Sequence, residues 1–226
     1  LRQRLEGLNL YLVGMMGSGK STAGRHLAEL LGYRFLDADI SIEQVAGRSI
    51  PELFASEGES GFRALEAAVL NQIASWHSLV VATGGGVVTR PENWGQLHQG
   101  VVIWLDAPDA LLLERLSSDP TPRPLLEAVD PTARLGELLG QRQPLYGQAD
   151  LRIQQDGADP GQVAGQVLAG LLVFGVGLYL ANLAAGLITS CPISQLAGVA
   201  TPFSLEIWSA SKALTTSAKF LPTLMG

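Results

Sequence analysis

Short apolar runs alternate with stretches in which apolar residues recur every three or four positions, and this alternation starts at the N-terminal end. Residues 8–13 form an apolar run that leads directly into a glycine-rich stretch. Residues 20–31 follow with helical spacing, and Gly32 is a typical helix stop. We expect Ala23, Leu27, Leu30 and Leu31 to share the buried face of this helix. The pattern therefore predicts a strand, a glycine loop and a helix.

The same alternation continues along the chain. The pattern predicts further strands at residues 33–37, 78–83 and 101–106 and further helices at residues 49–75, 108–116 and 131–143. Ser49 and Glu52 have the spacing of a capping box at the start of the second helix. Strands alternating with helices favour a parallel sheet covered by helices on both faces, with ligands beyond the carboxyl ends of the strands.

The stretch "SSDPTPRPLLEAVDP", residues 117–131, interrupts this alternation with four prolines in fifteen residues. Such a stretch does not continue a helix. It is typical of a surface loop. Next to a phosphate site it also suits a lid, because a basic residue on a mobile segment can close over a nucleotide and exclude water.

A change in composition marks the C-terminal part of the chain. Residues 160–205 carry no charged side chain, and residues 168–188 form an apolar run in which only Asn182 is strongly polar. This run reaches the length of about 20 residues that spans a bilayer. We expect a domain over residues 1–171 and an apolar extension over residues 172–226. Membrane association, burial or self-association, and a poorly ordered extension from a fusion or altered reading frame all remain open for it.

Charge and cysteine content narrow the class of protein. The chain has 15 basic and 21 acidic residues, a balance that argues against a nucleic-acid-binding surface. A single cysteine, Cys191, excludes an intramolecular disulfide, and no Cys/His pattern has metal-ligand spacing. The N-terminal residues lack the pattern of a cleavable signal. We therefore expect a cytoplasmic protein, with membrane contact through residues 168–188 as the open alternative.

The glycine-rich stretch "GMMGSGKST" carries the most specific chemical signal. Residues 14–21 fit the pattern G-x-x-x-x-G-K-[ST] between a strand and a helix, the context in which backbone N–H groups surround phosphate oxygens. Lys20 is expected to reach the β- and γ-phosphates, and Ser21 to bind Mg²⁺. Lys20 is also the first lysine of the chain, the next being Lys212. The pattern alone is shared by hydrolases, switches and kinases.

Two carboxylates follow the second predicted strand. Asp37 and Asp39 lie two residues apart, so they point the same way if the strand geometry persists. Near a phosphate site they could hold Mg²⁺ through water or accept a proton from an attacking hydroxyl. A solvated turn is the alternative interpretation.

An arginine and a run of glycines suggest a second ligand. Arg63 follows Phe62 on a predicted helix and could bind a carboxylate with a two-pronged fork, or form an ordinary surface pair with Glu66 or Glu59. The glycines 84–86 end a strand and let a ligand approach the main chain. No aspartate ends this strand, which argues against switch GTPases and motor ATPases.

Three later arginines, Arg115, Arg123 and Arg142, could stabilise the charge on a transferred phosphoryl group. Taken singly, each also fits an ordinary surface charge.

Together these motifs resemble those of the shikimate kinase family, a group of P-loop kinases related to nucleoside monophosphate kinases. The matching stretches are "GMMGSGKST", "DAD", "GFRALE", "GGGV", "RPLL" and "RQPLY", and they occur in the family's order. The resemblance covers about residues 5–170. It implies an α/β, three-layer P-loop kinase fold in which helices flank a central parallel sheet, here with an apolar C-terminal extension.

The resemblance also implies a role for each matching position. It implies that ATP, Mg²⁺ and shikimate bind, and that the shikimate 3-hydroxyl is phosphorylated. The implied nucleotide-binding residues are Gly17, Ser18, Gly19, Lys20, Ser21 and Thr22, with Arg115 on the adenine side and Arg123 on the lid. The implied shikimate-binding residues are Asp39, Arg63, Gly85 and Arg142. Lys20, Asp39 and Arg123 are the implied catalytic residues, while Ser21, and Asp37 through water, would hold the metal.

Other functions stay open at this point. A gluconate kinase or nucleoside monophosphate kinase shares the P-loop, although the anion-binding arginines and the triple glycine favour shikimate. A kinase-like module without catalysis is a further alternative, although Lys20 and Asp39 are both present. We expect the kinase domain to be monomeric.

Overall fold

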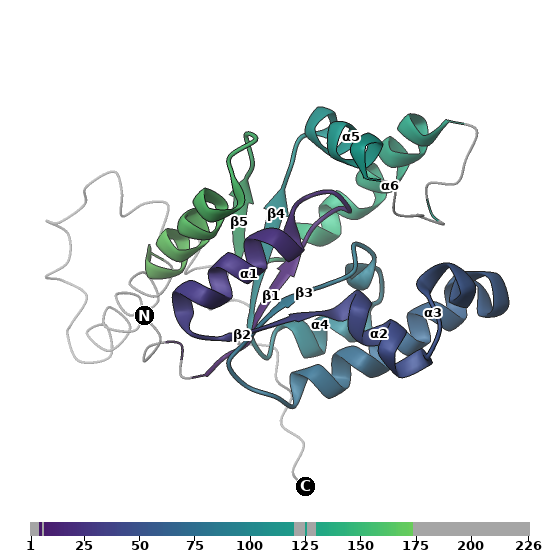
Figure 1. The fold of residues 1–226 in the computed structure, drawn as a ribbon, viewed down its shortest axis with the longest axis horizontal. Helices are drawn as coiled ribbons and strands as arrows, with labels where there is room; N and C mark the ends of the chain where they lie inside the picture. The colour runs from purple at the N-terminus through teal and green to yellow at the C-terminus, as the bar shows by residue number, and fades with distance from the viewer. Residues whose placement is uncertain (1–4, 6, 120–124, 126–129, 174–226) are drawn as a thin grey trace, which may run out of the picture. The chain divides into compact units, whose positions relative to one another are not determined.

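Five short parallel strands form one sheet in the order β2-β3-β1-β4-β5 (Figure 1). The structure is a computed structural model and describes residue 5 and residues 7–119, 125 and 130–173. The strands are β1 (Leu10–Val13), β2 (Arg34–Asp37), β3 (Leu79–Ala82), β4 (Val101–Asp106) and β5 (Leu151–Gln154). Each neighbouring pair is parallel. The expected parallel α/β sheet is therefore confirmed.

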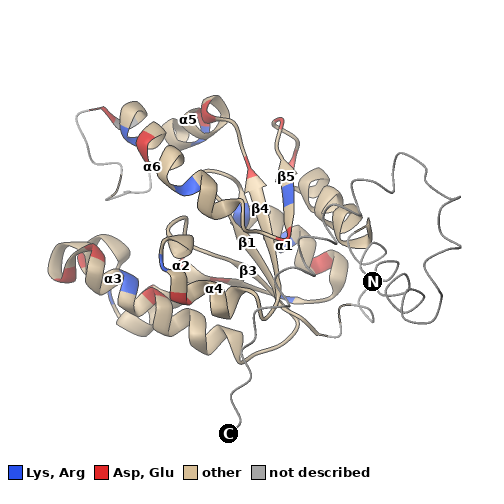
Figure 2. Ribbon diagram, turned by 180° about the vertical axis from the view of Figure 1, so that it is seen from behind, with Lys and Arg blue, Asp and Glu red and all other residues tan. Residues whose placement is uncertain are grey.

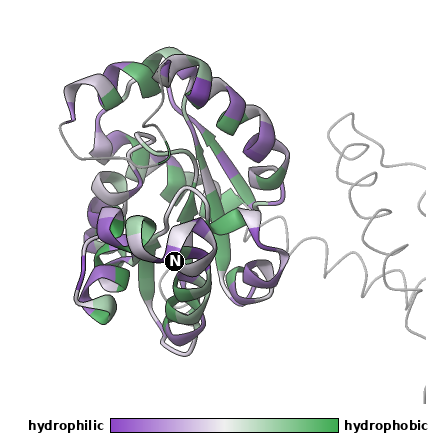
Figure 3. Ribbon diagram, turned by 90° about the vertical axis from the view of Figure 1, so that its right-hand side faces the viewer, coloured by the Kyte–Doolittle hydropathy of each residue, from purple (hydrophilic) through white to green (hydrophobic). Residues whose placement is uncertain are grey.

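Alternate residues of the central strands enter two different hydrophobic clusters, one on each face of the sheet. In β1, Tyr11 and Val13 belong to one cluster, while Leu10 and Leu12 belong to the other. This follows from the two-residue repeat of a strand, and burial on both faces explains why these strands read as continuous apolar runs. Figure 3 shows the hydrophobic strands between helices that carry hydrophobic and hydrophilic positions side by side. The arrangement gives three layers.

Helices cover both faces. They are α1 (Lys20–Leu31), α2 (Ala38–Ala46), α3 (Ile50–Ala74), α4 (Pro91–Leu97), α5 (Asp109–Ser118) and α6 (Pro131–Tyr146), with a 3-10 turn at Val87–Thr89. Residues 160–173 are also helical. Side chains of α1 and of residues 160–173 pack in one cluster, and those of α3 and α4 in the other. Figure 1 shows α1 and the helix of residues 160–173 adjacent on the same side of the sheet.

One predicted core position of α1 is wrong. Ala23, Leu27 and Leu31 are buried as expected, but 58% of Leu30 is exposed. Gly24 and Ala28 lie on the buried face instead. Because successive helical residues turn by about 100°, these two shift the buried arc away from Leu30. The predicted helix and its Gly32 end are confirmed, since Gly32 is the left-handed C-cap.

The start of α3 confirms the capping box, but the helix is not continuous. The Glu52 carboxylate accepts hydrogen bonds from the Ser49 backbone N–H and hydroxyl. At Gly58 the backbone leaves helical geometry, with φ 68° and ψ −179°. Residues 50–57 therefore form a separate helical piece in front of the long part of α3.

Several elements were not predicted from the pattern, namely α2, α4, β5 and the helix of residues 160–173. Of these, α2, α4 and β5 are short, with nine, seven and four residues. Leu1–Leu172 form one compact unit. Arg123, Cys191 and the extension from residue 174 onward lie outside the described residues. Within the described part, no helix is both long and apolar enough to cross a membrane.

Candidate active site

The glycine loop connects β1 to α1 at the carboxyl end of the sheet. Gly19 is the N-cap of α1, and Lys20 is its first residue. The Lys20 Nζ donates hydrogen bonds to the carbonyl oxygens of Gly14 and Met15, each at 2.9 Å. The lysine thus curls back over the loop at the N-terminus of α1, where the helix dipole favours an anion. This is the geometry of an anion cradle.

Ser21 and Asp37 meet beside this loop. The Ser21 hydroxyl donates a hydrogen bond of 2.6 Å to Asp37 Oδ2. The other oxygen of Asp37 accepts the backbone N–H of Asp39 at 3.1 Å, so Asp37 caps the N-terminus of α2. A hydroxyl and a carboxylate are ligands that Mg²⁺ prefers, so these two oxygens fit a metal site.

Asp39 faces the site by a different route from the one expected. Strand geometry ends at Asp37, and Asp39 lies in the first turn of α2. The expectation that the two carboxylates align along a strand is therefore wrong; the cap at Asp37 turns the chain and brings Asp39 beside Lys20. Burial, with the Asp37 charge as the second cause, raises the pKa of Asp39 to about 6, and Lys20 opposes the shift. Asp39 is thus a carboxylate whose proton affinity is tuned toward neutral pH.

Arg63 is a buried cation on α3 rather than a surface residue. Its Nη1 lies 2.8 Å from Glu66 Oε2, and its Nη2 lies 3.2 Å from Glu59 Oε1. The Arg63 backbone carbonyl accepts a hydrogen bond from Arg90. Both ion pairs that the sequence suggested are therefore present. Arg63 and Glu66 are buried, so their pair is not an ordinary surface pair.

Glu66 was not recognised as a site residue from the sequence. Among the described residues, its buried Oε1 has no hydrogen-bond partner, and burial raises the pKa of this carboxyl although the Arg63 charge opposes the rise. The i, i+3 spacing to Arg63 was visible in the sequence. What spacing does not show is that the pair faces the interior.

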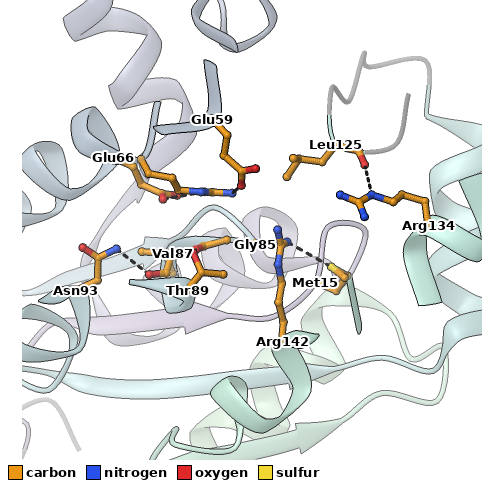
Figure 4. Close-up of polar contacts among 12 residues, drawn as sticks. Met15, Glu59, Glu66, Gly85, Val87, Thr89, Asn93, Leu125, Arg134 and Arg142 are labelled. Carbon is orange, nitrogen blue, oxygen red and sulfur yellow. Dashed lines mark hydrogen bonds and ion pairs between the residues drawn. The ribbon is translucent and has the colours of Figure 1, made fainter. Parts of the chain in front are cut away.

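Arg142 reaches the same region from α6. Its side chain is buried, and Nη1 lies 3.9 Å from the Met15 sulfur (Figure 4). One helical turn later, the Tyr146 hydroxyl donates a hydrogen bond to the Gly85 carbonyl. Burial raises the pKa of Tyr146 to about 12, so this hydroxyl stays a donor at neutral pH. Tyr146, which sequence reasoning missed, ties α6 to the glycine run.

The glycine run is needed because charged side chains press against it. A Cβ on Gly84 would lie 2.7 Å from Glu66 Oε1 and 2.8 Å from Asp39 Oδ1. A Cβ on Gly86 would overlap the guanidinium of Arg63. Any larger residue here would displace the acidic and basic groups of the site.

Two cavities meet at this place. One, of about 310 Å³, is lined by Lys20, Ser21, Asp37, Arg115 and other loop residues. The second, of about 480 Å³, is lined by Arg63, Glu66, Arg142 and an apolar wall that includes Phe54 and Phe62. Met16, Asp39 and Gly85 line both cavities. Asp39 thus lies where the cavity of the glycine loop meets the cavity that contains two buried arginines.

Arg115 contacts the glycine loop from α5. Its Nη1 donates to the Gly17 carbonyl at 3.1 Å and to Gln155 Oε1 at 3.3 Å. Gln155, which follows β5, donates in turn to the Ser18 carbonyl at 2.6 Å. The Thr22 hydroxyl bonds to the Gly19 carbonyl. The structure therefore brings together all the sequence-predicted site residues except Arg123, which lies outside the described residues.

Known proteins with similar sequences are shikimate kinases. The sequence model of the shikimate kinase family matches residues 16–171. The shikimate kinase of Synechococcus sp. (strain RCC307) is 61% identical over 168 residues, which are 74% of this chain and 86% of the relative. The shikimate kinase of Prochlorococcus marinus (strain MIT 9313) is 55% identical over 168 residues, or 74% of this chain and 88% of the relative.

Solved structures agree with the sequence comparison. The shikimate kinase from Acinetobacter baumannii in complex with shikimate matches with a TM-score of 0.73 and 43% identity, over 76% of this chain and 97% of that one. A gluconokinase from Sinorhizobium meliloti 1021 matches with a TM-score of 0.53 and 19% identity, over 77% of this chain and 97% of that one. The second likeness shows the fold alone, whereas the first agrees with the family match. This chain belongs to the shikimate kinase family.

Proposed function

We propose that this protein transfers the γ-phosphoryl group of ATP to the 3-hydroxyl of shikimate, giving shikimate 3-phosphate and ADP. The observation that carries the proposal is the position of Asp39, which lines both the phosphate cavity and the arginine-lined cavity. A hydroxyl held at Asp39 would face the phosphate cradle. Most of the rate then comes from positioning and from neutralising charge.

The larger cavity suits a small hydroxylated acid. Arg63 and Arg142 supply two buried positive charges for a carboxylate, and Asp39 supplies an acceptor for ring hydroxyls. Phe54 and Phe62, whose ring centroids lie 4.7 Å apart, give the cavity an apolar wall. These features support shikimate over a nucleoside monophosphate, whose acceptor group is itself a phosphate.

The general base in this proposal is Asp39. With a pKa raised to about 6, the carboxyl is mostly ionised above pH 7 and still has more proton affinity than an ordinary aspartate. It would accept the proton of the 3-hydroxyl during attack. Lys20, held over the loop by two carbonyls, would neutralise charge on the transferred group.

The nucleotide and metal are assigned to the glycine-loop side. Gly17, Ser18, Gly19 and Thr22 would surround the phosphates, and Arg115 would lie on the adenine side, where Gln155 fixes it. Ser21, and Asp37 through water, would hold Mg²⁺. When bound, Mg²⁺ offsets negative charge on the β- and γ-phosphates. Arg123 remains the proposed lid arginine on the strength of the family resemblance.

The direct test is an assay of ADP production by the full chain with MgATP and shikimate, gluconate or nucleoside monophosphates as acceptors. We expect turnover with shikimate only. In the same assay, Arg63→Ala should raise the KM for shikimate at least about tenfold and change the KM for ATP little. The reason is that the variant loses an ion pair with the carboxylate of shikimate and no contact with ATP. Turnover with gluconate but not shikimate would refute the proposal, and an unchanged shikimate KM would refute the role of Arg63.

A further inference from the structure

Arg63 lies between two carboxylates that differ greatly in exposure. Its Nη1 pairs with Glu66, whose side chain is 3% exposed, and its Nη2 pairs with Glu59, whose side chain is 53% exposed. Figure 2 shows a basic position in blue among acidic positions in red on α3, where Glu57, Glu59 and Glu66 flank Arg63 in the sequence. The two ion pairs of Arg63 therefore have different energetic weights.

The buried pair is costly to break, whereas the exposed pair is not. Separating Glu66 from Arg63 would leave a carboxylate that is 3% exposed without its ion-pair partner at 2.8 Å. Glu59 can exchange Arg63 for water, since exposed ion pairs contribute little to stability. When another anion approaches Arg63, the Nη2 side is thus the one that becomes available.

The Glu59 carboxylate is the more exposed partner of Arg63, and Arg63 itself lines the larger cavity. In Figure 4 the side chain of Glu59 descends from α3 and that of Arg142 rises from α6 toward the loop that contains Gly85. Glu59 directly follows Gly58, where α3 leaves helical geometry. Its neighbour Glu57 pairs with Arg48 instead. Of these two exposed glutamates, only Glu59 contacts the substrate-binding arginine.

We propose that Glu59 is a counterion of Arg63 that the carboxylate of the substrate displaces. In the free enzyme Glu59 holds the Nη2 group of Arg63, and the bound acid takes this group over while Glu66 stays in place. The proposal rests on the assignment of Arg63 to the carboxylate of shikimate. It makes Glu59 a determinant of affinity rather than a catalytic residue.

The displacement lowers the affinity of the site for any carboxylate that binds Arg63. Shikimate and a simple carboxylate must both remove Glu59 from the Nη2 group, so the competition weakens both by the same factor. Shikimate still binds more tightly, because its hydroxyls also gain contacts with Asp39.

The test compares Glu59→Gln with Glu57→Gln in the full chain. Glutamine keeps the length of the side chain and still accepts a hydrogen bond, but it removes the competing charge. We expect Glu59→Gln to lower the Kd for shikimate about two- to fivefold in calorimetric titration, the range for an exposed ion pair. The same variant should bind benzoate more tightly by a similar factor, and kcat should stay near the wild-type value. Glu57→Gln should leave both Kd values unchanged.

Three outcomes would overturn the proposal. An unchanged Kd for shikimate in Glu59→Gln would show that Glu59 does not compete, and a raised Kd would show that it orients Arg63 instead. A structure of the shikimate complex in which Glu59 is still paired with Arg63 would also overturn the proposal, because it would show that the substrate does not displace Glu59. Thermal melting of each variant shows whether it is folded. If the wild-type protein itself does not bind shikimate, the proposed function fails, and the comparison of the variants does not arise.

Discussion

Asp37 and Asp39 illustrate how neighbouring residues of one type acquire different roles. Asp37 accepts hydrogen bonds from the Ser21 hydroxyl and from the first turn of α2, so its oxygens are held in place. Asp39 is packed against Gly84 and close to the charges of Asp37, Lys20 and Glu66. Its charged form is disfavoured by burial, and this is the property that a general base requires.

The pKa of Asp39 leads to a prediction about both activity and stability. Since burial raises this pKa from its ordinary value of 3.8 to about 6, the folded chain favours the protonated carboxyl. Asp39 therefore destabilises the fold progressively as the pH rises from about 4 to about 6, and fully above that range. We expect Asp39→Asn to be more stable than the wild type at pH 7.5, on the order of 1–3 kcal/mol, and equally stable below pH 4.

Asp39→Asn should also lose activity at least about a hundredfold, because the amide cannot accept the proton of the attacking hydroxyl. In the wild type, kcat/KM for shikimate should fall as the pH decreases through about 6. Urea unfolding at several pH values and the pH profile of the assay provide the measurements. An Asp39→Asn protein that is less stable at pH 7.5 would contradict the assigned burial, and a pH profile flat down to pH 5 would contradict the role of Asp39.

At the scale of single elements, α3 combines a wall of the cavity and an arginine that faces it. Ser49, Ile50 and Phe54 line the cavity from the short helical piece, and Arg63 lines it from the long one. Gly58 separates the two pieces with φ 68° and ψ −179°, a conformation in which residues with a side chain are strained. The shape of the cavity thus depends on the break.

We expect Gly58→Ala to lower the stability of the folded protein by about 1–3 kcal/mol and to raise the KM for shikimate more than that for ATP. The space around Gly58 is open, so the effect would come from the backbone and not from a clash. Gly95→Ala is the matched control, because Gly95 lies in α4, has open space around it and no positive φ. It should raise stability by about 0.5–1 kcal/mol. Thermal melting and steady-state kinetics measure both effects, and equal behaviour of the two variants would count against the role of the break.

Elements that depend on a few adjacent residues could be predicted from the sequence alone. The glycine loop, the capping box of α3 and the apolar run of β4 could be located because each depends on residues adjacent in sequence. The inward orientation of Glu66 and the contact of Tyr146 with Gly85 could not, since both depend on how α3 and α6 pack. Arg142 was a candidate from the sequence, but its role at the substrate carboxylate came only from the family resemblance, because an arginine near the end of α6 has no local signature of such a role.

At the scale of the molecule, the helix of residues 160–173 completes the fold of the kinase unit. Val163, Ala164, Val167 and Leu171 are buried in the cluster that also contains residues of α1 and of the central strands. Gly170 packs against Leu151 of β5 so closely that a Cβ would lie 2.7 Å from it. This helix is therefore part of the domain, although the charge-free stretch of the sequence begins at the same residue, Pro160.

Two truncations separate this helix from the residues that follow. A chain that ends after Val173 should keep its melting temperature and its kcat/KM, because every described side chain of the two cavities and of the core is retained. A chain that ends after Asp159 would expose the apolar face of α1 and of the sheet, and we expect it to aggregate or to remain unfolded. Circular dichroism, melting and the ADP assay provide the comparison, and an active chain ending after Asp159 would show that the helix is dispensable.

Membrane fractionation of the full chain beside the chain ending after Val173 then assigns any membrane association to residues 174–226, since both chains contain the same kinase unit.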